Sequence, residues 1–141
     1  MKEYVLGFLF SADLERVVLV EKSKPAWQRG LLNGVGGAIE PGESPAGSMD
    51  REFHEETACP FSFRWTPLLV IDYPEARVYV FATATAGVFD LRGLPGEPVD
   101  WYPVKEVKGT IPNLAWMLPM AKLKLSNLTW ESGVLWHMKK A

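Results

Sequence analysis

The sequence contains little cysteine, no excess of positive charge and no long apolar run. Its single cysteine excludes a disulfide within the chain and is typical of a reducing compartment, so we expect a cytoplasmic protein. No stretch approaches the roughly 18 consecutive apolar residues of a transmembrane helix, so no membrane association is expected. The formal net charge is −2, without a basic stripe, which argues against binding of long nucleic acid through its phosphates.

Apolar residues are plentiful enough for a core. The chain has 141 residues, a length that suits one domain, and 48% of them are hydrophobic, which excludes a disordered chain. We therefore expect a single domain over residues 1–141, present as a monomer or a homodimer.

Apolar runs and turn residues predict several strands and a helix near the C-terminus. Strands are expected at residues 4–10, 17–20, 61–71 and 77–86. The third contains Pro67 and should be bent or at an edge, whereas the fourth should be central. Thr110 as N-cap, with Pro112 in the first turn, predicts a helix that reaches about residue 125. The tail, residues 128–138, is expected to add a strand or to pack across the sheet.

The most informative segment is acidic and spans residues 37–59. Ser44 is a favourable N-cap and Pro45 suits the first helical position, so a helix is predicted to begin there. At about 100° per residue, three acids share one face of that helix: Glu52, Glu55 and Glu56. The neighbouring face is apolar and is expected to pack on the core, through Ala46, Met49 and Phe53.

Three carboxylates on one helical face repel each other, and Arg51 alone cannot neutralise them. Mg²⁺ would, because it prefers oxygen ligands and is usually held by a few carboxylates together with substrate phosphates. The pattern therefore predicts a site for Mg²⁺, or Mn²⁺ in its place, at Glu52, Glu55 and Glu56. The alternative is a solvated acidic face without a ligand. That alternative leaves Gly36, Gly37 and Glu43 unexplained.

The spacing of this segment resembles the Nudix hydrolase box, G-x5-E-x7-R-E-U-x-E-E-x-G-U, where U is a bulky aliphatic residue. The identical positions are Gly37, Glu43, Arg51, Glu52, Glu55 and Glu56. Phe53 and Cys59 stand at the U positions. Ala58 replaces the second glycine, which usually closes the helix with a positive φ, so we expect Ala58 to cost about 1 kcal/mol there.

The resemblance implies an α/β fold, the Nudix-type α/β/α sandwich, with a mixed sheet between helices. It also implies hydrolysis of a nucleoside diphosphate linked to another moiety, with Mg²⁺ held by Glu52, Glu55, Glu56 and the carbonyl of Gly37. Glu43 would pair with Arg51 in a structural role. The general base varies in the family, so it is expected to be either Glu55 or a glutamate of the loop 87–99. Glu97 is the loop candidate and Asp100 the second choice, while the alternative is an ordinary loop carboxylate.

Residues 113–119 resemble a W-x-x-P helical segment of Nudix enzymes that act on purine nucleotides, in which a Trp and an Asn hold the base. The matching positions are Trp116 and Asn33, although Trp116 would also suit core packing and Asn33 a turn with positive φ. Trp27 is expected either to contact the substrate or to anchor its loop on the core.

These matches favour a purine nucleoside triphosphate, oxidised or not, as the substrate, split into monophosphate and pyrophosphate. The alternatives are an ADP-ribose or dinucleotide pyrophosphatase, a non-catalytic nucleotide-sensing module, and a protein-interaction domain that uses exposed tryptophans. An intact acidic face argues against a module without turnover. The expected partner is therefore a small-molecule nucleotide.

Overall fold

The computed structural model describes residues 1–87 and 89–129. The strands are β1 (Lys2–Ser11), β2 (Arg16–Glu21), β3 (Leu32–Asn33), β4 (Val35–Ala38), β5 (Thr66–Tyr73), β6 (Ala76–Thr85) and β7 (Val99–Pro103). The helices are the short 3-10 helix η1 (Ala26–Gln28), α1 (Pro45–Thr57) and α2 (Leu114–Thr129). The part of the predicted tail from residue 130 onward lies outside the described residues.

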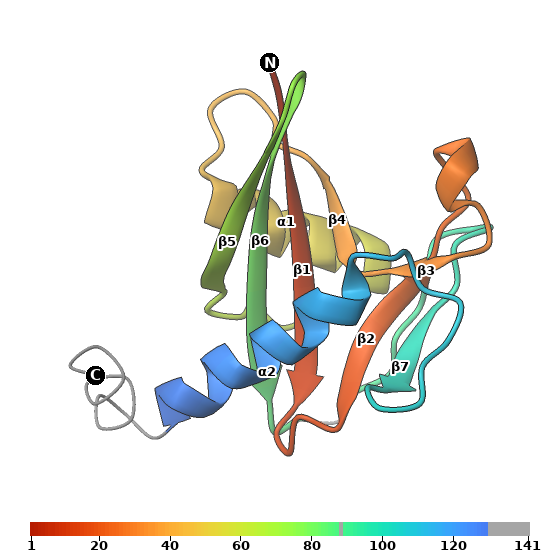
Figure 1. The fold of residues 1–141 in the computed structure, drawn as a ribbon, viewed down its shortest axis with the longest axis vertical. Helices are drawn as coiled ribbons and strands as arrows, with labels where there is room; N and C mark the ends of the chain where they lie inside the picture. The colour runs from red at the N-terminus through yellow and green to blue at the C-terminus, as the bar shows by residue number, and fades with distance from the viewer. Residues whose placement is uncertain (88, 130–141) are drawn as a thin grey trace.

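The strands form one mixed sheet of seven strands with β1 near its middle (Figure 1). Strand β1 pairs in parallel with β6, which in turn pairs antiparallel with the edge strand β5. The other edge of β1 is shared, because its first half pairs with β4 and Phe10 pairs with β2. The chain therefore passes from β3, which lies against β2, to β4, which lies against β1, and it does so at Gly34.

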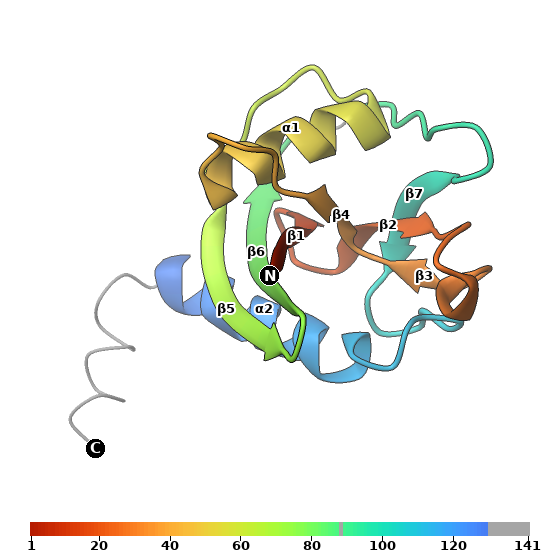
Figure 2. The ribbon, with the colours of Figure 1, turned by 90° about the horizontal axis from the view of Figure 1, so that it is seen from above.

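Helices α1 and α2 lie on opposite sides of this sheet (Figure 2). Side chains of a strand alternate between its faces, so β1 sends Phe8 and Phe10 into a core beneath α2, and Val5 and Leu9 into a core beneath α1. The predicted α/β/α sandwich is confirmed. Among the described residues, the helices are too short or too polar for any of them to cross a bilayer.

The predicted start of the acidic helix is confirmed. Ser44 is the N-cap of α1, its side chain accepts a hydrogen bond from the Gly47 amide at 3.0 Å, and Pro45 is the first helical residue. At the other end Ala58 adopts the left-handed conformation, with φ of 58° and ψ of 17°. Met49 and Phe53 are fully buried beneath the helix, as expected, whereas Ala46 is exposed, so the prediction that it packs on the core is wrong.

The predicted starts of two elements are wrong, and α2 continues to Thr129 instead of ending near residue 125, so residues 128 and 129 are helical and do not belong to a tail strand. Helix α2 begins at Leu114, and Thr110 instead bridges to Leu32 of β3. The Leu32 amide donates to the Gly109 carbonyl and the Leu32 carbonyl accepts from the Ile111 amide, so residues 109–111 are held beside β3 rather than starting the helix. Strand β5 begins at Thr66 rather than at residue 61, although it is an edge strand with a bulge beside Pro67, as expected.

Candidate active site

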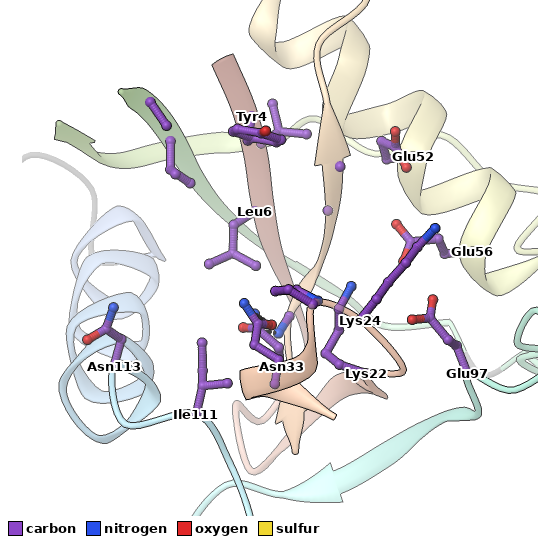
Figure 3. Close-up of a pocket in the computed structure, with 18 of the residues that line it drawn as sticks. Tyr4, Leu6, Lys22, Lys24, Asn33, Glu52, Glu56, Glu97, Ile111 and Asn113 are labelled. Carbon is purple, nitrogen blue, oxygen red and sulfur yellow. Dashed lines mark hydrogen bonds between the residues drawn. The ribbon is translucent and has the colours of Figure 1, made fainter. Parts of the chain in front are cut away.

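A cavity of about 830 Å³ opens between the acidic face of α1 and the start of α2. Glycine-rich β4 lies along it, and η1 and the loop before β7 complete its wall. Figure 3 shows Glu52 and Glu56 on one side of this cavity, Glu97 below them, and Asn33, Ile111 and Asn113 on the opposite side. A volume near the upper end of the usual range suits a ligand of nucleotide size.

Glu56 is the most unusual side chain of the cavity. The residue is only 6% exposed, and its Oε2 atom has no hydrogen-bond partner in the described part of the chain. Burial, with further help from the neighbouring Glu52 carboxylate, raises the pKa of Glu56 to about 8. Burial also raises the pKa of Glu52. An ionised carboxylate in such a place is costly unless a cation compensates it.

Arg51 connects the loop before α1 to the acidic face. Its guanidinium donates to both carboxylate oxygens of Glu43, at 2.7 and 2.9 Å, and it also contacts Glu52 at 3.2 Å and Glu55 at 3.1 Å. These hydrogen bonds hold the pKa of Glu43 well down, at about 2. The Glu43–Arg51 pairing that the resemblance implies is therefore present as a bidentate ion pair.

The donor set at this end of the cavity suits a hard cation. Its acidic side chains offer only oxygens, and one of these, Oε2 of Glu56, is buried without a hydrogen-bond partner among residues 1–87 and 89–129. Gly37 leaves room for the Glu52 carboxylate directly beside β4, because a Cβ atom there would overlap that carboxylate in its present position. As the side chains stand, no three acidic, histidine or cysteine residues of the described chain converge on one point. Binding would require Glu52 and Glu55 to turn away from Arg51.

Glu97 faces the same cavity from the loop before β7 (Figure 3). One of its oxygens, Oε2, accepts hydrogen bonds from both the amide and the hydroxyl of Ser23, at 2.9 and 2.7 Å. Burial acts to raise the pKa of Glu97, but these bonds and the nearby Lys22 and Lys24 outweigh it, so the pKa is lowered. Asp100, the second choice, lies in β7 opposite Leu19, is exposed and does not line the cavity.

The predicted base-binding residues are only partly brought together. Asn33 is 7% exposed, lies in β3 without a positive φ and lines the cavity, so the alternative of a left-handed turn is wrong. Trp27 of η1 also lines the cavity and is 63% exposed, so it does not anchor the loop on the core. Trp116 is 46% exposed and lies outside the cavity, which contradicts both core packing and contact with a ligand there. Successive helical residues point about 100° apart, so its neighbour Met117 takes the place at the cavity wall.

Comparison with known families settles the class of protein. The family model described as NUDIX domain matches residues 2–123. The chain belongs to the NUDIX family. With the acidic residues of its box intact, it is a pyrophosphohydrolase of that family.

Solved structures share the Nudix fold at low sequence identity. The MutT NUDIX hydrolase from Burkholderia pseudomallei is 15% identical over 84% of this chain and 96% of its own, with a TM-score of 0.70. The NUDIX domain of Shewanella oneidensis NrtR, complexed with ADP ribose, is 18% identical over 86% of each chain, with a TM-score of 0.67. A MutT/nudix family protein from Enterococcus faecalis is 19% identical over 72% of this chain but only 43% of its own, with a TM-score of 0.64. A comparison with curated proteins finds no match.

Two cations of this Nudix cavity were not predicted from the sequence. Lys22 and Lys24 line it from the connection between β2 and η1, and Figure 3 draws them between Asn33 and the acidic side chains. Asn113, which precedes α2 and lies on the same side of the cavity as Asn33, was not predicted either. Lysines in a polar loop carry no distinguishing spacing, so only their position in the fold separates them from ordinary surface charges.

Proposed function

We propose that this Nudix protein catalyses Mg²⁺-dependent hydrolysis of a nucleoside diphosphate linked to another moiety, with a purine nucleoside triphosphate as the first candidate substrate. The observation that carries the proposal is the buried Oε2 atom of Glu56. Within the described chain this atom has no hydrogen-bond partner, and it lies at the acidic end of a nucleotide-sized cavity. A carboxylate oxygen in that position is costly in the protein alone and becomes favourable when a cation binds it.

The residues that would hold the ion are Glu52, Glu55, Glu56 and the carbonyl of Gly37. When bound, Mg²⁺ would neutralise charge on the phosphate oxygens and lower the pKa of a bound water. Through its bidentate ion pair with Glu43, Arg51 would fix the position of the acidic face relative to the loop before α1. The cavity walls would hold the remainder of the substrate and exclude bulk water.

The reaction is a displacement at phosphorus. The oxygen of a water forms a new bond to one phosphorus of the diphosphate while the bond from that phosphorus to the bridging oxygen breaks. The bridging oxygen leaves with the second product, which for a triphosphate gives monophosphate and pyrophosphate. A carboxylate takes the proton of the water. Glu55, which is half-exposed, and Glu97, which has a lowered pKa, both remain candidates for this base.

Three features favour a purine nucleoside at the other end of the cavity. Asn33 supplies an amide that can both donate and accept, and Gln28 lies beside it, with the two amides 3.2 Å apart. Trp27 presents an aromatic ring at the rim. ADP-ribose or a dinucleotide is the second candidate, because the cavity of about 830 Å³ leaves room for it and the similar NrtR domain is complexed with ADP ribose. A cytoplasmic location would suit each of these substrates.

A substrate panel tests the proposal directly. Purine nucleoside triphosphates, their oxidised forms, ADP-ribose and dinucleoside polyphosphates are incubated with and without Mg²⁺, and the products are identified by chromatography. We expect Mg²⁺-dependent cleavage of a triphosphate to monophosphate and pyrophosphate. Glu56→Gln should lower kcat by at least about 100-fold, while Glu106→Gln, at an exposed turn far along the chain, should leave it unchanged. Wild-type protein that cleaves no member of the panel would reject catalysis and favour a sensing module.

A further inference from the structure

The only cations that line the cavity, among the described residues, are Lys22 and Lys24. Both come from one short connection, and Ser23 lies between them. Neither lysine forms an ion pair with a carboxylate in the described part of the chain. Both lysines act through their charge on Glu97, and Lys22 also acts on Glu56, but no carboxylate of the described chain lies within ion-pair distance of either ammonium group.

Hydrogen bonds of Ser23 hold the segment that contains both lysines. The amide and hydroxyl of Ser23 both donate to Oε2 of Glu97, which fastens the connection between β2 and η1 to the loop before β7. Both hydrogen bonds use the same oxygen of Glu97, which itself lines the cavity. Because the backbone of Ser23 is held by Glu97, the backbones of Lys22 and Lys24 on either side are held as well, and both lysines line the cavity (Figure 3).

The acidic side chains of the cavity have other groups besides the lysines to compensate their charge. Glu97 accepts two hydrogen bonds from Ser23, which stabilise its charge more than the nearby lysines do. On the proposed function, the acids of α1 are compensated by bound Mg²⁺ and by Arg51. An ammonium group is a compact point charge with three donors, and it suits the terminal oxygens of a phosphate. Two of them on one short segment suit a phosphate that lies beyond the ion-bound diphosphate.

We propose that Lys22 and Lys24 bind the outermost phosphate of the substrate, with Ser23 as the residue that positions them through Glu97. The inference rests on the proposed function and makes it narrower: the site selects nucleoside triphosphates over substrates such as ADP-ribose, whose diphosphate is capped by a sugar. The lysines then determine specificity, while the acids of α1 determine cleavage.

Two slowly cleaved analogues separate this role from general charge attraction. Guanosine triphosphate and diphosphate analogues with a methylene bridge between the α- and β-phosphorus differ only in the γ-phosphate. Their affinities are measured by calorimetry in Mg²⁺ for wild-type protein and for Lys22→Gln, Lys24→Gln and, as a control, Lys105→Gln at an exposed turn. Each of the first two should weaken the triphosphate analogue about 10-fold and the diphosphate analogue much less. The control should alter neither.

Ser23 is tested by its effect on the same preference. Ser23→Ala should reduce the ratio of the two affinities, and Ser23→Thr, which keeps the hydroxyl, should restore it, while thermal melting checks that each variant is folded. Equal loss for both analogues in the lysine variants, or a wild-type protein that binds the two alike or binds neither, would overturn the inference. Since binding is measured without turnover, these outcomes are separate from failure of the proposed hydrolysis, which appears as absence of product from every nucleotide.

Discussion

Ala58 shows how one residue stores a small strain at the exit of the Nudix box helix. It adopts φ of 58°, one of only two positive φ values at residues other than glycine in the described chain, and its amide donates to the His54 carbonyl. A left-handed residue at this position ends the helix, and the Cβ of alanine is crowded there. Ala58→Gly should therefore raise the free energy of unfolding by about 1 kcal/mol, measured by chemical denaturation.

A matched control separates this local relief from the general effect of glycine. Ala46 is exposed in the first turn of α1, where the backbone is helical and glycine is unfavourable. Ala46→Gly should lower the free energy of unfolding by about 0.5–1 kcal/mol. If both substitutions destabilise the protein equally, Ala58 is not strained.

Among the helices and strands, the sequence predicts best those whose ends are set by local capping residues. Helix α1 is bounded by Ser44, Pro45 and Ala58, all of which act locally, so its limits are recoverable from the sequence. Helix α2 is not, because residues 109–111 are captured by hydrogen bonds to Leu32, which is about 80 positions away in the chain. A favourable N-cap at Thr110 is therefore overridden by a contact that local reasoning cannot see.

The candidate site divides in the same way. Fixed spacing identifies the acidic face of α1, because the three glutamates share one helix. The opposite wall is assembled from β3, η1 and the start of α2, so the contribution of each residue depends on the tertiary fold. Trp116 was expected at that wall and lies outside it, while Met117, one position further, lines it. A single step along a helix is enough to reverse such a prediction.

The ion pair between Glu43 and Arg51 joins the loop to helix α1 and should respond to pH. The pKa of Glu43 is about 2 in the folded protein and ordinarily about 4.5. A carboxyl with a lowered pKa in the folded state stabilises it above its ordinary pKa, and that stabilisation is lost as the pH falls from 4.5 towards 2. Wild-type protein should therefore be more stable than Glu43→Gln at pH 7, and the difference in free energy of unfolding should shrink across that range.

The stabilities of wild-type protein and Glu43→Gln should approach each other at low pH for a simple reason. Protonated Glu43 carries no charge, so at low pH it resembles the glutamine that replaces it. Glu15, exposed in the turn between β1 and β2, has no ion pair among the described residues, and Glu15→Gln should differ little from wild type at any pH. Urea titrations at several pH values measure both. A constant difference between wild type and Glu43→Gln down to pH 2 would contradict the ion-pair explanation.

At the scale of the whole molecule, the buried cores and the candidate site lie in different places around the sheet. Its two faces pack against α1 and α2 through separate cores, and the cavity occupies the side where β3 and β4 part. One wall of that cavity belongs to α1 and the other to the segment before α2. A ligand that spans the cavity therefore contacts both layers, and whatever binds the acidic wall should stabilise the complete fold.

Bound Mg²⁺ should raise the melting temperature for that reason. An ion that binds only the folded state stabilises it by about 2.7 kcal/mol at 100 times its dissociation constant. For a protein of this size that corresponds to a shift of roughly 5–10 °C. The measurement is thermal melting in MgCl₂ and in EDTA, with NaCl at matched ionic strength to separate specific binding from screening. Glu56→Gln should reduce the shift strongly, because it removes the charge of the buried carboxylate, whereas Glu106→Gln should preserve it. A wild-type protein with the same melting temperature in Mg²⁺ and in EDTA would mean that the buried Oε2 atom of Glu56 is tolerated without a cation, and the acidic face would then be a solvated surface.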